Sequence, residues 1–135
     1  MSSPQRILAL DVGERRIGVA QGDMMVRIAV PYDTIERDGN EVAQIAQLVI
    51  DGDIDHLVIG YPRNQSGDPT PQTASVEAFA ELLKDIDAKI IFQDESLTSV
   101  LAEQHLKQRG KPYESGDIDA LAASIILEDF LEAQP

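Results

Sequence analysis

The chain has 135 residues and no cysteine, so we expect one domain with one hydrophobic core, spanning residues 1–135, and disulfides and thiolate metal sites are excluded. Its 11 Lys and Arg residues face 24 Asp and Glu residues, and the resulting net charge of −13 argues against broad, non-specific binding of nucleic acid. No apolar run approaches the roughly 20 residues of a membrane span and no signal peptide is apparent, so we expect a cytoplasmic protein without membrane partners.

Three short apolar segments separated by turn signals open the chain. They cover Arg6–Asp11, Arg16–Gln21 and Val26–Val30, with turns at Gly13–Arg15 and Gly22-Asp23. Short strands joined by tight turns are typical of an antiparallel meander. The first third of the chain is therefore predicted to form three adjacent antiparallel strands.

Beyond residue 40 the spacing of apolar residues alternates between the helical and the strand period. The predicted elements are a helix capped by Asn40 that runs to Val49, a strand at His56–Ile59, a loop at Gly60–Gln72, a helix over Val76–Leu83, a strand at Lys89–Gln93, a helix over Thr98–Gln108 and a last helix over Asp119–Leu131 with Ser115 or Asp117 as its cap. Alternating strands and helices require parallel strands joined by crossover helices. We predict an α/β fold: a mixed five-stranded sheet, part antiparallel meander and part parallel βα units, with helices on both faces.

Three carboxylates stand at the edges of apolar segments, where a charge against the core is costly unless something compensates it. Asp11 ends the first strand, Glu95 follows the last strand, and Asp119 opens the last helix. Ligands of such sheets bind at the carboxyl ends of the strands. Because converging carboxylates repel one another, a divalent cation is the simplest partner that reconciles them. The pattern indicates a magnesium or manganese site for phosphoryl transfer.

Two of these acids, Asp11 and Asp119, also have ordinary structural explanations. Asp11 would suit an Asx turn, and Asp119 would suit a helix N-terminus. Strand alternation places Glu95 and its neighbour Asp94 on opposite faces, and the sequence does not decide which of the two meets the metal. A strand that ends in Asp-x-Gly also begins the phosphate-binding hairpin of actin-like ATPases, so a nucleotide-binding module is a further alternative.

Four motifs follow one another along the chain. They are Ile7–Gly13 with Arg16–Ala20, Gly60–Pro62 with Asn64 and Gly67, Asp94–Thr98, and Asp119–Ala123. In this order they resemble the YqgF family, whose members are described as Holliday junction resolvases or as nucleases that process pre-ribosomal RNA. The similarity runs from about Arg6 to Leu131. The family has an RNase H-like fold, in agreement with the topology predicted above.

The resemblance implies a metal-dependent nuclease whose acidic triad corresponds to Asp11, Glu95 and Asp119. In that chemistry two Mg²⁺ or Mn²⁺ ions activate a water molecule and stabilise the leaving oxygen of a phosphodiester. Basic and polar side chains near the motifs are expected to bind the substrate. These are Arg15, Arg16, Arg63, Asn64, Lys107, Arg109 and Lys111.

The function that the resemblance favours is cleavage of structured nucleic acid, first of all at the 5′ end of pre-16S rRNA and in contact with pre-ribosomal particles. Two alternatives stay open: a Holliday junction resolvase that acts on branched DNA, and a nucleic-acid- or ribosome-binding factor without catalysis. A resolvase cuts two symmetric strands and should be a two-fold dimer. The RNA-processing role leaves monomer and homodimer open.

Overall fold

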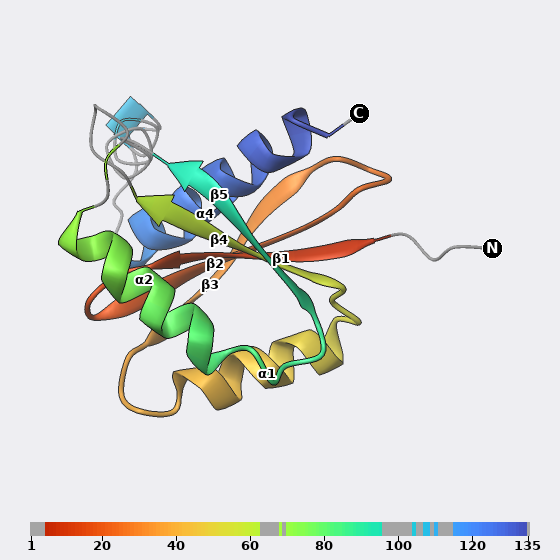
Figure 1. The fold of residues 1–135 in the computed structure, drawn as a ribbon. Coiled ribbons are helices and arrows are strands. Elements are labelled where there is room, and N and C mark those ends of the chain that lie inside the picture. Colours follow the sequence, from red (N-terminus) through yellow and green to blue (C-terminus); the bar gives the residue numbers. More distant parts are fainter. Residues whose placement is uncertain are drawn as a thin grey trace.

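A five-stranded sheet with the strand order β3-β2-β1-β4-β5 forms the middle layer of the fold (Figure 1). Its strands are β1 (Arg6–Val12), β2 (Arg16–Asp23), β3 (Ala29–Glu36), β4 (His56–Pro62) and β5 (Lys89–Glu95). The computed structural model describes residues 5–62, 68, 70–95, 104, 107, 108, 110 and 115–134, without the side chains of residues 95, 115 and 116. β1, β2 and β3 pair antiparallel, whereas β1, β4 and β5 pair parallel. The predicted mixed sheet is confirmed.

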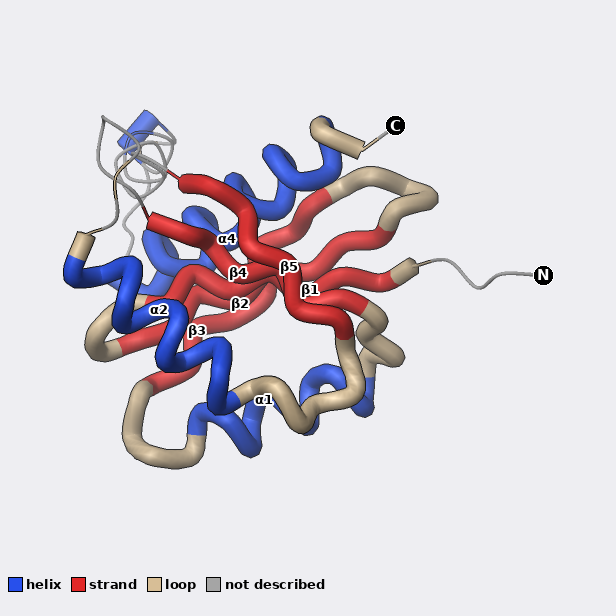
Figure 2. Tube along the Cα trace, viewed as in Figure 1, coloured by secondary structure: helices blue, strands red, loops and turns tan. Residues whose placement is uncertain are grey.

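Helices cover both faces of this sheet (Figure 2). They are α1 (Glu41–Asp51), α2 (Pro71–Leu82) and α4 (Ser115–Glu132). Because side chains of a strand alternate between faces, Leu8 and Leu10 pack with α1 and α2, while Ile7 and Ala9 pack with α4. The sheet thus divides the hydrophobic core into two layers, one on each face. Within the described part of the chain, no helix is long and apolar enough to cross a membrane.

The third strand lies further along the chain than predicted. Strand β3 covers Ala29–Glu36 rather than Val26–Val30, and the turn before it includes Arg27 in the left-handed conformation, with φ of 60°. The predicted strand ended at Val30, before Pro31, whose ring lacks a backbone N–H donor. β3 is an edge strand, and its pairing with β2 has an irregularity at Val19/Ala20, where Pro31 lies; such positions tolerate proline, and the pairing continues to Glu36.

Two other predicted boundaries change. The last helix begins at Ser115, so Ser115 and Asp117 lie within its first turn and do not precede it. The prediction started from the apolar period, which begins only at Ala120, whereas helical backbone extends over the polar residues before it. The long loop is shorter at both ends, because β4 runs to Pro62 and α2 starts at Pro71, capped by Thr70. Most of the predicted helix over residues 98–108 lies outside the described residues.

Candidate active site

Asp11 lies at the carboxyl end of β1, on the face that α4 covers. It is half-buried and pairs across the sheet with Gly18 of β2. Its position is in phase with Ile7 and Ala9, which pack against α4. The parallel strands β1, β4 and β5 bring their carboxyl ends to this same edge, where α/β sheets bind ligands.

Gly18 allows the second turn of α4 to rest directly on the sheet. A Cβ atom at this position would lie 1.9 Å from the carbonyl oxygen of Asp119 and 3.0 Å from the backbone nitrogen of Ala120. No side chain fits such an approach, so the residue must be glycine. Because Gly18 is the strand partner of Asp11, this contact brings the backbone of Asp119 next to the strand pair that carries Asp11.

Arg16 links β2 to α4 through the side chain of Asp119. The Nε–H of Arg16 donates to Oδ2 of Asp119 at 2.7 Å, across 103 residues of sequence. The two side chains are 32% and 25% exposed. This hydrogen bond, and then the negative charge of Asp119, raises the pKa of Arg16, so the guanidinium is positively charged at neutral pH. A cation therefore already lies beside one of the three predicted metal ligands.

The register of β5 distinguishes between the two neighbouring acids at its end. Asp94 is in phase with Ile90, which packs against the core on the α1 and α2 side of the sheet. Glu95 is the last residue of the strand, and its side chain lies outside the described residues. The two-residue period groups Glu95 with Ile91, which packs on the α4 side. The backbone thus favours Glu95 over Asp94 as the third acid.

The donor chemistry of this edge fits a hard divalent cation. Asp11 and Asp119 supply carboxylate oxygens, the ligand type that Mg²⁺ and Mn²⁺ prefer, and the guanidinium beside Asp119 shows that the place accommodates positive charge. Among the described side chains, which exclude that of Glu95, no group of three His, Asp or Glu residues is close enough to hold an ion. The structure places the backbone of Asp119 beside Gly18, the strand partner of Asp11, and the metal-binding triad stays a prediction.

The predicted substrate contacts are placed only in part. Arg15 is exposed in the turn between β1 and β2, next to the strand end that carries Asp11. Arg16 is engaged by Asp119. Lys107 is exposed. Four further candidates lie outside the described residues: Arg63, Asn64, Arg109 and Lys111. Their contacts with nucleic acid stay predictions.

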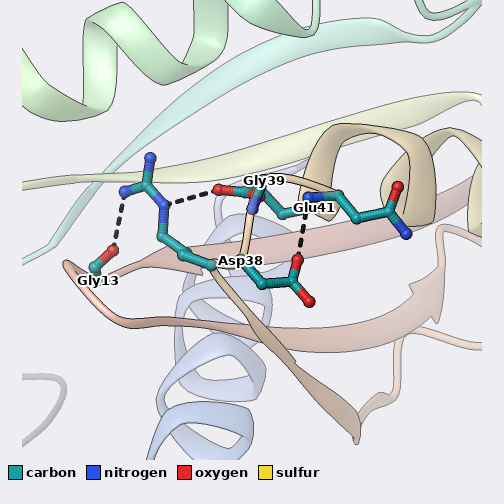
Figure 3. A network of polar contacts seen from close by, with 6 residues as sticks. Gly13, Asp38, Gly39 and Glu41 are labelled. Carbon is teal, nitrogen blue, oxygen red and sulfur yellow. Dashed lines mark hydrogen bonds and ion pairs between the residues drawn. The ribbon is translucent and has the colours of Figure 1, made fainter.

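Arg37, the residue after β3, is hydrogen-bonded to the turn that follows β1, in which Figure 3 labels Gly13. Its backbone N–H donates to the carbonyl of Arg15 at 2.9 Å, and its Nη1 donates to the carbonyl of Gly13 at 3.0 Å. Its Nε donates to Oε2 of Glu41 in α1 at 3.3 Å, and its guanidinium lies 4.9 Å from the ring centroid of Phe79 in α2. One side chain thus joins the turn to both helices of this face.

The sequence prediction missed Gly18 and Arg37. A glycine inside an apolar strand is a recognised signal of close backbone approach, and Gly18 stands between Ile17 and Val19. Arg37 carries no such signal, because its partner Gly13 is 24 residues away and only the pairing of β3 with β2 brings them together.

The fold defines a class of protein, the RNase H-like domains. The structure of T. thermophilus RuvC in complex with a Holliday junction substrate matches 96% of this chain and 95% of RuvC, with a TM-score of 0.59 and 12% sequence identity. The Fowlpox virus resolvase in complex with Holliday junction DNA matches 96% of this chain and 98% of the resolvase, with a TM-score of 0.59 and 13% identity. At these identities the likeness concerns the fold alone.

Sequence comparison identifies the family. Residues 5–133 match the RuvX family, described as Holliday junction resolvase, and the chain belongs to this family of nucleases, which is the YqgF family of the motif comparison. A protein of Chloroflexus aggregans is 45% identical over 135 residues, which cover 96% of this chain and 95% of that protein. It is named "Putative pre-16S rRNA nuclease".

Proposed function

We propose that the chain is a divalent-metal-dependent endonuclease that hydrolyses phosphodiester bonds in structured nucleic acid, with the 5′ end of pre-16S rRNA as its substrate. Membership of a nuclease family and the name of the Chloroflexus relative support this function. The structural observation that carries the proposal is the approach of α4 to Gly18. That approach brings Asp119 to the strand end that carries Asp11, at the ligand-binding edge of the sheet.

Asp11, Glu95 and Asp119 are the residues that would hold Mg²⁺ or Mn²⁺. When bound, the metal supplies an activated water and neutralises charge on the scissile phosphate. The chain itself contributes position: β1 fixes Asp11, and the contact at Gly18 fixes the helix that carries Asp119. Arg15, exposed beside this edge, is suited to contact a phosphate of the substrate backbone. Arg63, Asn64, Lys107, Arg109 and Lys111 complete the proposed substrate contacts.

The test is cleavage of an RNA that carries the 5′ leader of 16S rRNA, with Mg²⁺ or Mn²⁺ and with chelator. We expect Asp11→Asn and Asp119→Asn each to lower the cleavage rate at least about 100-fold, because each removes an anionic ligand while keeping the side-chain shape. Asp117→Asn is the matched control, since it removes an exposed carboxylate from the first turn of the same helix. It should cleave like the wild type.

Equal cleavage by the wild type and Asp11→Asn, or no cleavage by either, would contradict the proposed hydrolysis. Absence of cleavage together with tight RNA binding would instead favour a binding factor. The same role implies a cytoplasmic protein that meets pre-ribosomal particles, which co-sedimentation with ribosomal precursors in cell extract would test.

The description of the family as Holliday junction resolvase favours a second candidate, cleavage of branched DNA. The two candidates share the metal chemistry but differ in symmetry, because a resolvase makes paired cuts across a two-fold axis. Paired cuts in a four-way junction by a dimer would support the resolvase. Cuts confined to RNA by a monomer would support RNA processing.

A further inference from the structure

The backbone of Arg16 is fixed by contacts with β3 and with the turn after β1, and its side chain extends to α4. It is the first residue of β2 and pairs with Glu36 of β3. Its carbonyl accepts a hydrogen bond from the N–H of Gly13 at 2.9 Å, which closes the turn after Asp11. The guanidinium therefore extends from the same hairpin that carries Asp11, and its Nε meets Asp119 at 2.7 Å. Arg16 is thus the direct side-chain link between the two elements of the candidate site.

The hydrogen bond from Arg16 occupies only one of the two oxygens of the Asp119 carboxylate. An ionised carboxylate has two oxygens with about four acceptor positions. The Nε–H of Arg16 bonds to Oδ2, which leaves Oδ1 as a ligand atom. Carboxylates that bind metals are themselves commonly held by hydrogen bonds from neighbouring side chains, and loss of such a partner costs about 10–100-fold in metal affinity or activity.

We propose that Arg16 is a positioning residue of the candidate metal site, which orients the Asp119 carboxylate through Oδ2 so that Oδ1 can bind the cation. This inference rests on the proposed metal-dependent function. It assigns to Arg16 a role that differs from the phosphate contact expected from the sequence. Arg15, its exposed neighbour in the turn, is left as the arginine that meets the substrate.

Two effects of the guanidinium oppose each other. Its positive charge repels a divalent cation, but its side chain is about one-third exposed, and solvent weakens this repulsion. Its hydrogen bond fixes a side chain that would otherwise lose rotamer freedom on binding the metal, and its charge offsets the repulsion between Asp119 and Asp11. We expect the second effect to dominate, so removal of Arg16 should weaken metal binding.

The test is the affinity for Mn²⁺ alone, without nucleic acid, measured from the electron paramagnetic resonance signal of the free ion. We expect Arg16→Gln to weaken the affinity at least about 10-fold. Arg16→Lys keeps the charge but not the guanidinium, so its affinity should be intermediate. Arg27→Gln is the matched control: it removes an exposed arginine in the turn before β3, and the Mn²⁺ affinity should stay within about 2-fold of the wild type.

A double-mutant cycle separates positioning from a general loss of structure. In an Asp119→Asn background, Arg16→Gln should produce no further loss of Mn²⁺ affinity, because the orienting bond has already lost its anionic acceptor. Melting temperatures in chelator show whether each variant folds. If Arg16→Gln does not fold, the affinity of Arg16→Lys provides the test instead. Unchanged or tighter Mn²⁺ binding by Arg16→Gln would overturn the inference but not the proposed function. A wild type that binds no Mn²⁺ would overturn both.

Discussion

Gly18 is the residue on which the docking of α4 depends. A Cβ atom there would lie 1.9 Å from the carbonyl oxygen and 2.3 Å from the carbonyl carbon of Asp119. These are backbone atoms, so no side-chain rotation relieves the overlap and the helix itself must move. Movement of α4 would disturb the packing of Ala123, Ile126 and Leu127, which are fully buried against the sheet.

We expect Gly18→Ala to lower the free energy of unfolding by about 2–3 kcal/mol or more, at the upper end of the cost of overpacking a core. Urea denaturation measures this loss. Gly52→Ala is the control, because its Cβ would lie 3.2 Å from the carbonyl oxygen of Leu48 and 3.3 Å from the side chain of Ile54, and its φ of −97° suits any residue. That variant should lose less than about 1 kcal/mol. Equal losses in the two variants would contradict the role given to Gly18.

At the scale of elements, the Arg37 network joins the turn after β1, the end of β3 and the start of α1. Glu41, the first residue of α1, is buried and receives hydrogen bonds from Arg37 at 3.3 Å and from the N–H of Gly39 at 2.7 Å (Figure 3). Its own backbone N–H contributes most to lowering the pKa of the Glu41 carboxyl; burial opposes this, and the Gly39 amide and Arg37 add to it. The network therefore requires the ionised carboxylate.

This pKa shift predicts how stability depends on pH. A carboxyl whose pKa is lower in the folded state stabilises the fold above its unfolded pKa and loses that contribution as the pH falls through its folded pKa. We expect the wild type to exceed Glu41→Gln in free energy of unfolding at pH 7. The difference should shrink below about pH 4.3, the ordinary value for Glu. Urea denaturation of both proteins at several pH values measures it, and a difference that is independent of pH would contradict the role of the carboxylate.

Elements with a local pattern were predictable, and contacts between elements were not. The apolar periods of Ile7–Leu10 and of the last helix gave the mixed sheet and its covering helices. The limits of β3 followed from pairing with β2 past Pro31, which no local pattern reports. At the site, the sequence pattern placed Asp11 at a strand end. The ion pair of Arg16 with Asp119, 103 residues apart, depends on the packing of α4 onto Gly18, which no local pattern reports.

At the scale of the whole molecule, the charge opposes the proposed substrate. A net charge of −13 repels the phosphates of nucleic acid, so binding must come from local cations and from a metal ion at the acidic edge. The guanidinium of Arg16 already forms an ion pair with Asp119. Among the candidates that the structure describes, Arg15 is the exposed arginine nearest in sequence to Asp11 and the clearest phosphate contact.

Each phosphate contact contributes about 0.7–0.9 to the slope of log affinity against log salt concentration, because it releases condensed counterions. We therefore expect Arg15→Gln to weaken RNA binding and to reduce this slope by about 0.7–0.9. Fluorescence anisotropy between 50 and 200 mM salt, a range over which such contacts weaken markedly, measures the slope, with Asp11→Asn as the background so that the RNA is not cleaved. Arg27→Gln is the matched control, since Arg27 lies at the opposite end of the β2–β3 hairpin from Arg16 and should leave the slope unchanged. An unchanged slope in Arg15→Gln, or an equal reduction in both variants, would show that the phosphates do not bind at the edge that carries Asp11.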